Sequence, residues 1–203
     1  MLAEELLAEC DHVLLAFDGP VARLPSVAAA ERLRGLIADE PLPPDVAGTG
    51  DPFAVIAHAT TIGPATGQVL YEHLCRIDFE LVGGAQVTEG VHAALAILGA
   101  TGTRVTVISG MHAEAVNSFL VMHGLSAHVK RLSARTSPNP AVLPPAPDLI
   151  TAALGGDSCV FIGTHRRDLA AAAAAGVSVL RHETTVATTT ADPNRNPWFA
   201  ALS

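Results

Sequence analysis

Several side chains that can move a proton or hold a ligand follow the ends of apolar runs in this sequence. Asp18 follows the run from Val13 to Phe17, and Ser109 follows RVTVI. His165 and Asp168 follow the run SCVFI, within the stretch GTHRRD. In an open parallel sheet, ligands bind at the carboxyl ends of the strands, so these residues mark a candidate site. A histidine beside a carboxylate can act as acid or base near neutral pH, because an unperturbed imidazole titrates at ~6.5.

The same residues also have purely structural interpretations. Asp18 can do no more than cap the turn that Gly19 and Pro20 impose. His165 can pair with Asp18 and Asp168 simply to neutralise two acids. The spacing along the chain leaves both interpretations open.

The order of the elements predicts an α/β fold with a parallel sheet. Apolar runs typical of buried strands alternate with helical patterns, and this alternation favours right-handed crossovers. Between the first two strands lie helical patterns and a Pro/Gly linker, and a loop with five prolines precedes the third strand. We expect Trp198 and Phe199 in the C-terminal tail to dock on the body; the alternative is a surface for a partner. The expected strands are 13–17, 104–108, 158–162 and 177–180, the expected helices 26–39, 64–79 and one starting at 51, the linker 41–50 and the proline loop 133–147.

Composition excludes several classes of function. The 203 residues carry 12 Lys and Arg against 20 Asp and Glu, a formal charge of −8, without a basic run that could follow a phosphate backbone. Nucleic acid is therefore not an expected partner. No apolar run approaches the roughly 20 residues of a membrane span, and the three cysteines lack a CxxC spacing, so we expect a cytoplasmic protein with reduced thiols. The sequence leaves a homodimer open.

The stretch from Ala16 to Val21, AFDGPV, resembles the first motif of the haloacid dehalogenase (HAD) superfamily, Asp-x-Asp-Gly-Pro-Val. In that family the first Asp attacks phosphorus and the second is the acid/base; Ala16 stands at the first position and Asp18 at the second. Ser109, at the end of its strand, is similar to the second motif. The resemblance implies a Rossmannoid three-layer fold, a parallel sheet flanked by helices with an inserted α-helical cap. It places the core in residues 1–19 and 89–203 and the cap in 20–88.

The chain departs from the family at three catalytic positions. Ala16 has no nucleophilic atom, which closes the aspartyl-phosphate route. In LPPAP, Pro144 occupies the place of the family's lysine, and in GTHRRD, Thr164 replaces the first metal-binding acid while Asp168 matches the second. Magnesium prefers carboxylate oxygens, and of the usual set only Asp18 and Asp168 remain, so we expect no metal and no other cofactor.

These departures favour a protein that has left phosphate hydrolysis. The first hypothesis is a repurposed, metal-independent enzyme for cyclisation, isomerisation or elimination on a small organic molecule between cap and core, in a setting such as natural-product biosynthesis. The alternative is a non-catalytic pseudophosphatase that acts as a binding or regulatory module, and a residual HAD hydrolase is the least favoured. The candidate catalytic residues are Asp18, His165, Asp168 and His112, and the candidate ligand-binding residues are Ser109, Gly110, Arg166, His58 and Tyr71.

Overall fold

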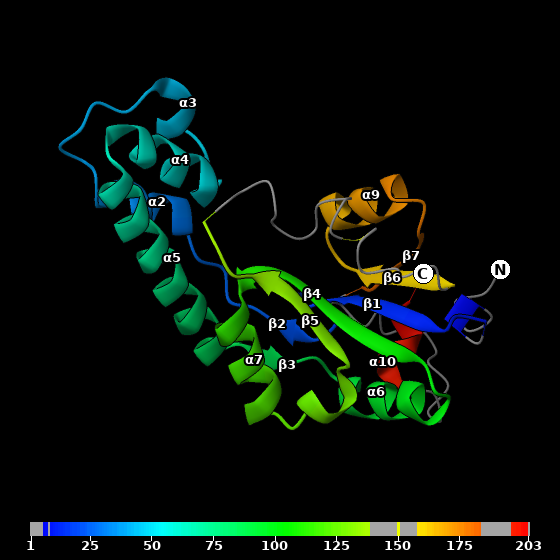
Figure 1. Cartoon of the computed structure of the whole chain (residues 1–203). Helices are drawn as coiled ribbons and strands as arrows, with labels where there is room; N and C mark the ends of the chain where they lie inside the picture. Colours follow the sequence, from blue (N-terminus) through cyan, green and yellow to red (C-terminus); the bar gives the residue numbers. More distant parts are fainter. Residues whose placement is uncertain (1–5, 8, 139–149, 151–157, 184–195, 203) are drawn as a thin grey trace.

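A parallel sheet forms the centre of the molecule (Figure 1). The structure is a computed structural model that describes residues 6–7, 9–138, 150, 158–183 and 196–202. Within these residues the sheet has five strands in the order β5-β4-β1-β6-β7, and every neighbouring pair is parallel. This confirms the predicted α/β fold. The strands are β1 (His12–Ala16), β4 (Arg104–His112), β5 (Arg131–Arg135), β6 (Cys159–Gly163) and β7 (Ser178–Arg181).

The central strand β1 is buried on both faces, which explains its unbroken apolar sequence. Val13 and Leu15 point into one hydrophobic cluster, together with residues of α6 (Val91–Ala100) and α7 (Ala113–Met122). Leu14 and Ala16 point into a second cluster, together with residues of α9 (Arg166–Ala174). Because successive side chains of a strand point to opposite faces, a strand between two helical layers must be apolar throughout. The result is three layers, with β1 in the middle.

Four helices that follow β1 and precede α6 pack on one another to one side of the sheet, and we call them the cap (Figure 1). They share a hydrophobic cluster of their own, separate from the two clusters of the sheet. A short antiparallel pair, β2 (Ala22–Arg23) with β3 (Gln86–Val87), joins the chain entering the cap to the chain leaving it. The cap helices are α2 (Ala29–Gly35), α3 (Pro44–Ala47), α4 (Pro52–Ile62) and α5 (Pro64–Gly84).

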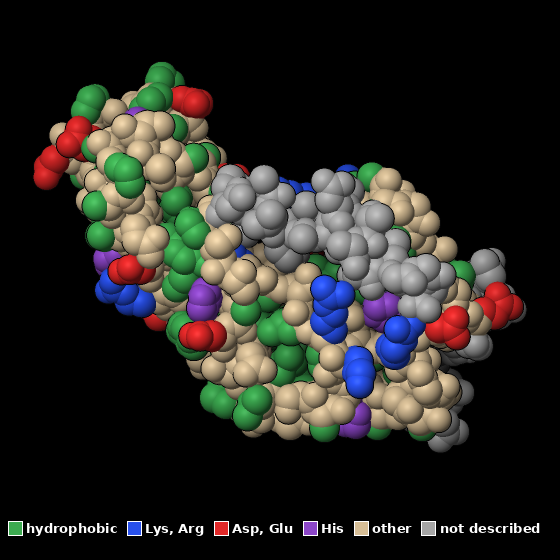
Figure 2. Space-filling view, in the orientation of Figure 1, with side chains coloured by type: hydrophobic (Ala, Val, Ile, Leu, Met, Phe, Trp, Pro, Cys, Tyr) green, Lys and Arg blue, Asp and Glu red, His purple; other side chains and the backbone are tan. Residues whose placement is uncertain are grey.

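Helices α4 and α5 begin where the sequence predicts, but α2 covers only the middle of the expected helix 26–39, and two further differences concern α5 and α3. Asp51 caps α4, with its side chain accepting a hydrogen bond from the Phe53 backbone N–H, as the Asp-Pro start indicates. Helix α5 continues five residues beyond the expected end at Phe79, and α3 lies within the expected linker. In Figure 2 hydrophobic side chains are visible between the cap and the sheet, where α5 contacts α7 and β4.

Two strands differ from the sequence prediction. β4 does not end before Ser109 but continues to His112, and its pairing with β5 shifts register between Ile108 and His112. β5 itself was not predicted, because RLSAR alternates polar and apolar residues at the sheet edge and three of its residues were assigned to the proline loop. The rest of that loop, including Pro144, lies outside the described residues.

The C-terminal segment docks on the core, as expected for Trp198. Helix α10 (Pro197–Ala200) places the Trp198 side chain in the cluster beneath α6, with 1% of the residue exposed. The residues after β7 pair with this segment through a bridge between His182 and Leu202. Elsewhere in the described chain, η1 (Ser126–His128) links α7 to β5, and no disulfide joins the three cysteines. None of the described helices is long and apolar enough to cross a membrane.

Candidate functional site

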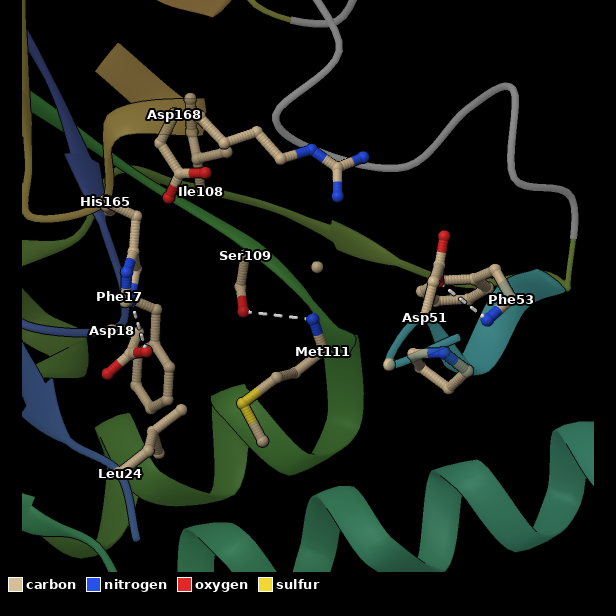
Figure 3. A pocket seen from close by; sticks show the side chains of 15 residues that line it. Phe17, Asp18, Leu24, Asp51, Phe53, Ile108, Ser109, Met111, His165 and Asp168 are labelled. Atoms are coloured by element: carbon tan, nitrogen blue, oxygen red, sulfur yellow. Dashed lines mark hydrogen bonds and ion pairs between the residues drawn. The ribbon is translucent and has the colours of Figure 1, made fainter. Parts of the chain in front are cut away.

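A pocket of about 480 Å³ lies where β1, β4 and β6 end, and the cap forms its opposite wall (Figure 3). The core side carries the polar residues predicted from the sequence, and the cap side is formed by the start of α4 and the residues before it. The pocket therefore lies between cap and core, where the ligand was expected. Its lining residues are Ala16, Phe17, Asp18, Leu24, Gly50, Asp51, Pro52, Phe53, Ile108, Ser109, Gly110, Met111, His165, Arg167 and Asp168.

Asp18 and His165 face each other in this pocket. The His165 Nε2 and the Asp18 Oδ2 are 2.8 Å apart, and the two side chains are 56% and 42% exposed (Figure 3). Asp18 follows β1 and His165 follows β6, the strand paired beside it, so the parallel sheet brings residues 147 positions apart to one edge. The pair has the composition of a proton-transfer dyad.

A close backbone approach sets the distance between the two loops that carry this pair. Gly19 has φ +95°, and a Cβ built there would lie 1.9 Å from the Thr164 Oγ1. Only glycine leaves room for Thr164 in this conformation. Since Asp18 precedes Gly19 and His165 follows Thr164, this contact holds the Asp18 and His165 side chains next to one another.

Asp168 lies in the first turn of α9 and borders the same pocket. Burial raises the pKa of its carboxyl group above the ordinary aspartate value; nearby His165 and Arg167 oppose that rise, and Asp18 adds to it. A raised pKa means that the group keeps its proton to a higher pH than a solvated aspartate does. Burial at this position therefore favours the protonated form of Asp168 relative to a solvated aspartate.

Ser109 and Gly110 line the pocket from within β4, at the point where the strand shifts register. The Ser109 Oγ accepts a hydrogen bond of 3.1 Å from the Met111 backbone N–H, which holds the irregular strand in shape (Figure 3). A hydroxyl that accepts in this way still has its own proton to donate. Ser109 can therefore donate a hydrogen bond to a ligand oxygen.

Other predicted site residues do not reach the pocket. His112 is the last residue of β4 and the N-cap of α7, where its backbone N–H donates to the Asp78 carboxylate over 2.9 Å. Tyr71 is buried in the cap cluster, and His58 is half-buried on α4. Arg166 is exposed at the start of α9, and Arg167 is the arginine that borders the pocket instead.

An unpredicted network joins the core to the cap beside the pocket. The guanidinium of Arg135, at the end of β5, pairs with the carboxylate of Asp78 on α5, and Arg135 is 1% exposed. Its Nε donates to the Gly110 carbonyl over 3.1 Å, and the guanidinium lies 4.9 Å and 5.6 Å from the ring centres of Tyr71 and Phe53. Burial raises the pKa of Asp78, and the Arg135 charge and the backbone N–H bond oppose that rise. Because Gly110 and Phe53 line opposite walls, Arg135 fixes the distance between them.

The residues present do not fit the magnesium ion that the family resemblance implies. Within the described residues no group of three or more His, Cys, Asp and Glu side chains is arranged to hold a metal. Asp18 is bonded to His165, and the Thr164 hydroxyl donates to the His182 carbonyl over 3.2 Å. Magnesium requires near-octahedral oxygen ligation, usually with one or two carboxylates free to bind. The Thr164 hydroxyl is therefore engaged in a hydrogen bond that supports the loop before His165.

Comparison with solved structures decides the fold family. CbbY from Rhodobacter sphaeroides in complex with phosphate superposes with a TM-score of 0.61 over 91% of each chain, at 15% identity. The chain has the HAD-like fold. A predicted phosphatase from Clostridium acetobutylicum matches with a TM-score of 0.58 over 84% of this chain and 83% of its own, at 16% identity. Protein Tyrosine Kinase A from Mycobacterium tuberculosis matches with a TM-score of 0.54 over 91% of each chain, at 18% identity.

No protein-family model and no curated protein matches the sequence. At these identities the structural likeness establishes the architecture alone, because one fold supports many unrelated activities. The function of this HAD-like chain must therefore be argued from its own pocket.

Proposed function

We propose that this HAD-like protein is an enzyme that has lost phosphoryl transfer and performs metal-independent acid/base chemistry on a small organic molecule. The reaction class is cyclisation, isomerisation or elimination, in each of which a proton leaves one atom and another proton is delivered elsewhere. The observation that carries the proposal is the 2.8 Å contact between the Asp18 carboxylate and the His165 imidazole at the pocket wall.

The exposure of the Asp18–His165 pair supports a chemical role. If the Asp18–His165 pair served stability alone, it would add little in such a position, because an exposed ion pair contributes about 0–1 kcal/mol to the free energy of unfolding. An imidazole held by a carboxylate is oriented in one tautomer, and the carboxylate balances the charge when the ring takes up a proton. We assign His165 as the general base and Asp18 as the residue that orients it.

Asp168 supplies the matching acid in this proposal. Its burial raises its pKa above that of a solvated aspartate, and it borders the same pocket as His165. A carboxyl group whose environment favours the protonated form, placed near a base, is a common arrangement of an acid/base site. Ser109 then donates a hydrogen bond to the ligand oxygen that gains charge.

The pocket's composition supports the loss of phosphoryl transfer. Ala16 presents a methyl group where the family has its nucleophile. Among the described lining residues there is no lysine, and the one arginine, Arg167, is outnumbered by the carboxyl groups of Asp18, Asp51 and Asp168, which do not favour a dianion. Phe53, Met111 and other apolar side chains line the rest. This lining suits a molecule with an apolar body and a polar head that is neutral or carries one charge.

A non-catalytic binding or regulatory module is the second candidate. The observation that favours it is the pairing itself, because the Asp18 carboxylate and the His165 ring already satisfy one another by a hydrogen bond. Such a module would hold the same kind of ligand without converting it. The two candidates differ in a single measurable respect, the appearance of a product that depends on Asp18.

The test compares the purified protein with its Asp18→Asn and Asp39→Asn variants, each incubated with a fractionated extract of small metabolites. Asp39 is an exposed carboxylate beyond α2 and serves as the matched control. We expect mass spectrometry to show a compound consumed by the wild type and by Asp39→Asn but not by Asp18→Asn. Ligand binding without conversion by any of the three would support the module instead. Turnover of a generic aryl phosphate with magnesium, above a heat-inactivated control, would overturn the loss of phosphoryl transfer.

A further inference from the structure

The C-terminal segment 196–202, which we call the clasp, bonds to the turn after β1 and to the residues that follow β7. The residues that follow β7 bond in turn to the loop after β6, which carries His165. The clasp therefore adds a second link between the Asp18 turn and the His165 loop, besides the close approach of Gly19 to Thr164.

At its first end the clasp holds the turn that follows Asp18. The Trp198 Nε1 donates a hydrogen bond of 2.8 Å to the carbonyl of Pro20, two residues after Asp18. The Asn196 side chain accepts from the Trp198 backbone N–H over 2.9 Å and donates to the Gly90 carbonyl over 3.1 Å. A Cβ at Gly90 would lie 2.2 Å from the Asn196 Oδ1, so the clasp fits closely against the core.

At its other end the clasp supports the loop that carries His165. The Glu183 backbone N–H donates to the Ala201 carbonyl over 2.8 Å. The neighbouring His182 donates its backbone N–H to the Gly163 carbonyl over 2.8 Å and accepts from the Thr164 hydroxyl over 3.2 Å. A continuous set of hydrogen bonds thus runs from the clasp to the residue before His165.

These contacts matter because the reactive side chains are not held by packing. Asp18 and His165 are each about half exposed, so their alignment depends on the backbone of the two loops. Proton transfer requires heavy atoms within hydrogen-bond reach, and a misplacement of about 1 Å can cost 10²-fold in rate. A buried hydrogen bond to the Pro20 carbonyl limits the movement of the turn that carries Asp18.

We infer that Trp198 is a positioning residue of the active site, which acts through its indole N–H to keep Asp18 in register with His165. The inference rests on the proposed function for the role of the pair, and it adds the C-terminal segment to the catalytic machinery. Trp198 does not line the pocket itself. It sets the position of the turn that carries Asp18, whose carboxylate lines the pocket.

The test is the tautomer of the His165 ring in Trp198→Phe, which keeps an aromatic ring but removes the N–H donor together with part of the buried indole volume. Ring ¹⁵N chemical shifts, recorded where the imidazole is neutral, report which nitrogen carries the proton. A carboxylate beside Nε2 favours protonation of Nε2, so Asp18→Asn gives the reference for a lost pair. In Trp198→Phe we expect the ratio of the Nε2-protonated to the Nδ1-protonated tautomer of His165 to fall at least about twofold.

Leu125→Ala is the control for loss of stability, because Leu125 is fully buried in the same cluster and its aliphatic side chain makes no hydrogen bond. It should leave the His165 shifts at wild-type positions. If Trp198→Phe does not fold, Asn196→Ala loosens the same end of the clasp and should move the shifts in the same direction. Wild-type His165 shifts in a folded clasp variant would overturn the inference. The proposed function is tested separately, by whether Asp18→Asn loses the ability to convert a substrate. The tautomer measurement needs no substrate, so the two tests can fail independently.

Discussion

The buried His182 should make the protein less stable as the pH falls below neutrality. His182 is 2% exposed, and neither nitrogen of its ring has a hydrogen-bond partner among the described residues. The ring packs 5.3 Å from that of Trp198, and a cavity beside it is lined by Arg23, Glu89 and Glu183. Burial lowers the pKa of His182 to about 4, because the protonated ring loses its hydration.

The size of the effect follows from the two pKa values. In the unfolded chain the ring titrates at ~6.5, so between that value and about 4 the unfolded state binds more protons than the folded state. Stability is therefore fully present above the unfolded pKa and is lost as the pH falls through this window. At 1.36 kcal/mol per unit, the full window is worth about 3 kcal/mol, and the step from about pH 7 to about pH 5 costs about 2 kcal/mol.

The assay is urea unfolding of the wild type, His182→Phe and His92→Gln at both pH values. Phe retains an aromatic ring against Trp198 and removes the titrating group, and His92 is an exposed histidine on α6. We expect the free energy of unfolding to fall by about 2 kcal/mol more in the wild type and in His92→Gln than in His182→Phe. Other groups that titrate in this range cancel in the comparison. An equal fall in all three proteins would refute the assignment of the effect to His182.

The remaining predictions concern the cap, the metal and the loop contact. Arg135→Met should lower the free energy of unfolding by about 3–5 kcal/mol, because it leaves the Asp78 carboxylate buried without its partner. The double variant Arg135→Met/Asp78→Asn should recover part of that loss. Urea unfolding in which the losses of the two substitutions simply add would contradict this. Thermal melts with millimolar magnesium and with a chelator should coincide, since a ligand stabilises only by binding the native state, and a rise of several degrees would show a bound metal. Gly19→Ala should cost about 1–3 kcal/mol from strain and collision with Thr164, and a crystal structure should show Asp18 displaced; an unchanged melting temperature would refute it.

The core half of the pocket could be predicted from the sequence, because strand ends in a parallel sheet meet at one edge. Asp18, Ser109, His165 and Asp168 each follow or end an apolar run, and all of them line the pocket. Their chemical roles stay predictions. What the sequence could not supply is the direction of side chains on helices. Arg166 and Arg167 are adjacent, but successive helical residues point about 100° apart, so the start of α9 decides which one faces the ligand.

No comparable rule predicts from the sequence which residues of the cap line the pocket. His58 and Tyr71 were candidates because a cap supplies ligand contacts, but the packing of its helices turns them away from the pocket and brings Phe53 and Asp51 to it. The pairing of Arg135 with Asp78 joins residues 57 positions apart across two hydrophobic clusters. Such a pair follows from tertiary packing, and neither residue lies in a motif that could have indicated it.

The same pairing limits how freely this cap could be exchanged for another. Helical inserts are natural units for transplantation between proteins of one architecture, since the chain enters and leaves through the narrow β2–β3 ribbon. Here the insert contributes the carboxylate of Asp78 and the core contributes the guanidinium of Arg135, both withdrawn from solvent. A cap grafted without its counterpart would bring a lone buried charge to the junction. Cap and core of this protein should therefore be inherited, or redesigned, as a matched set.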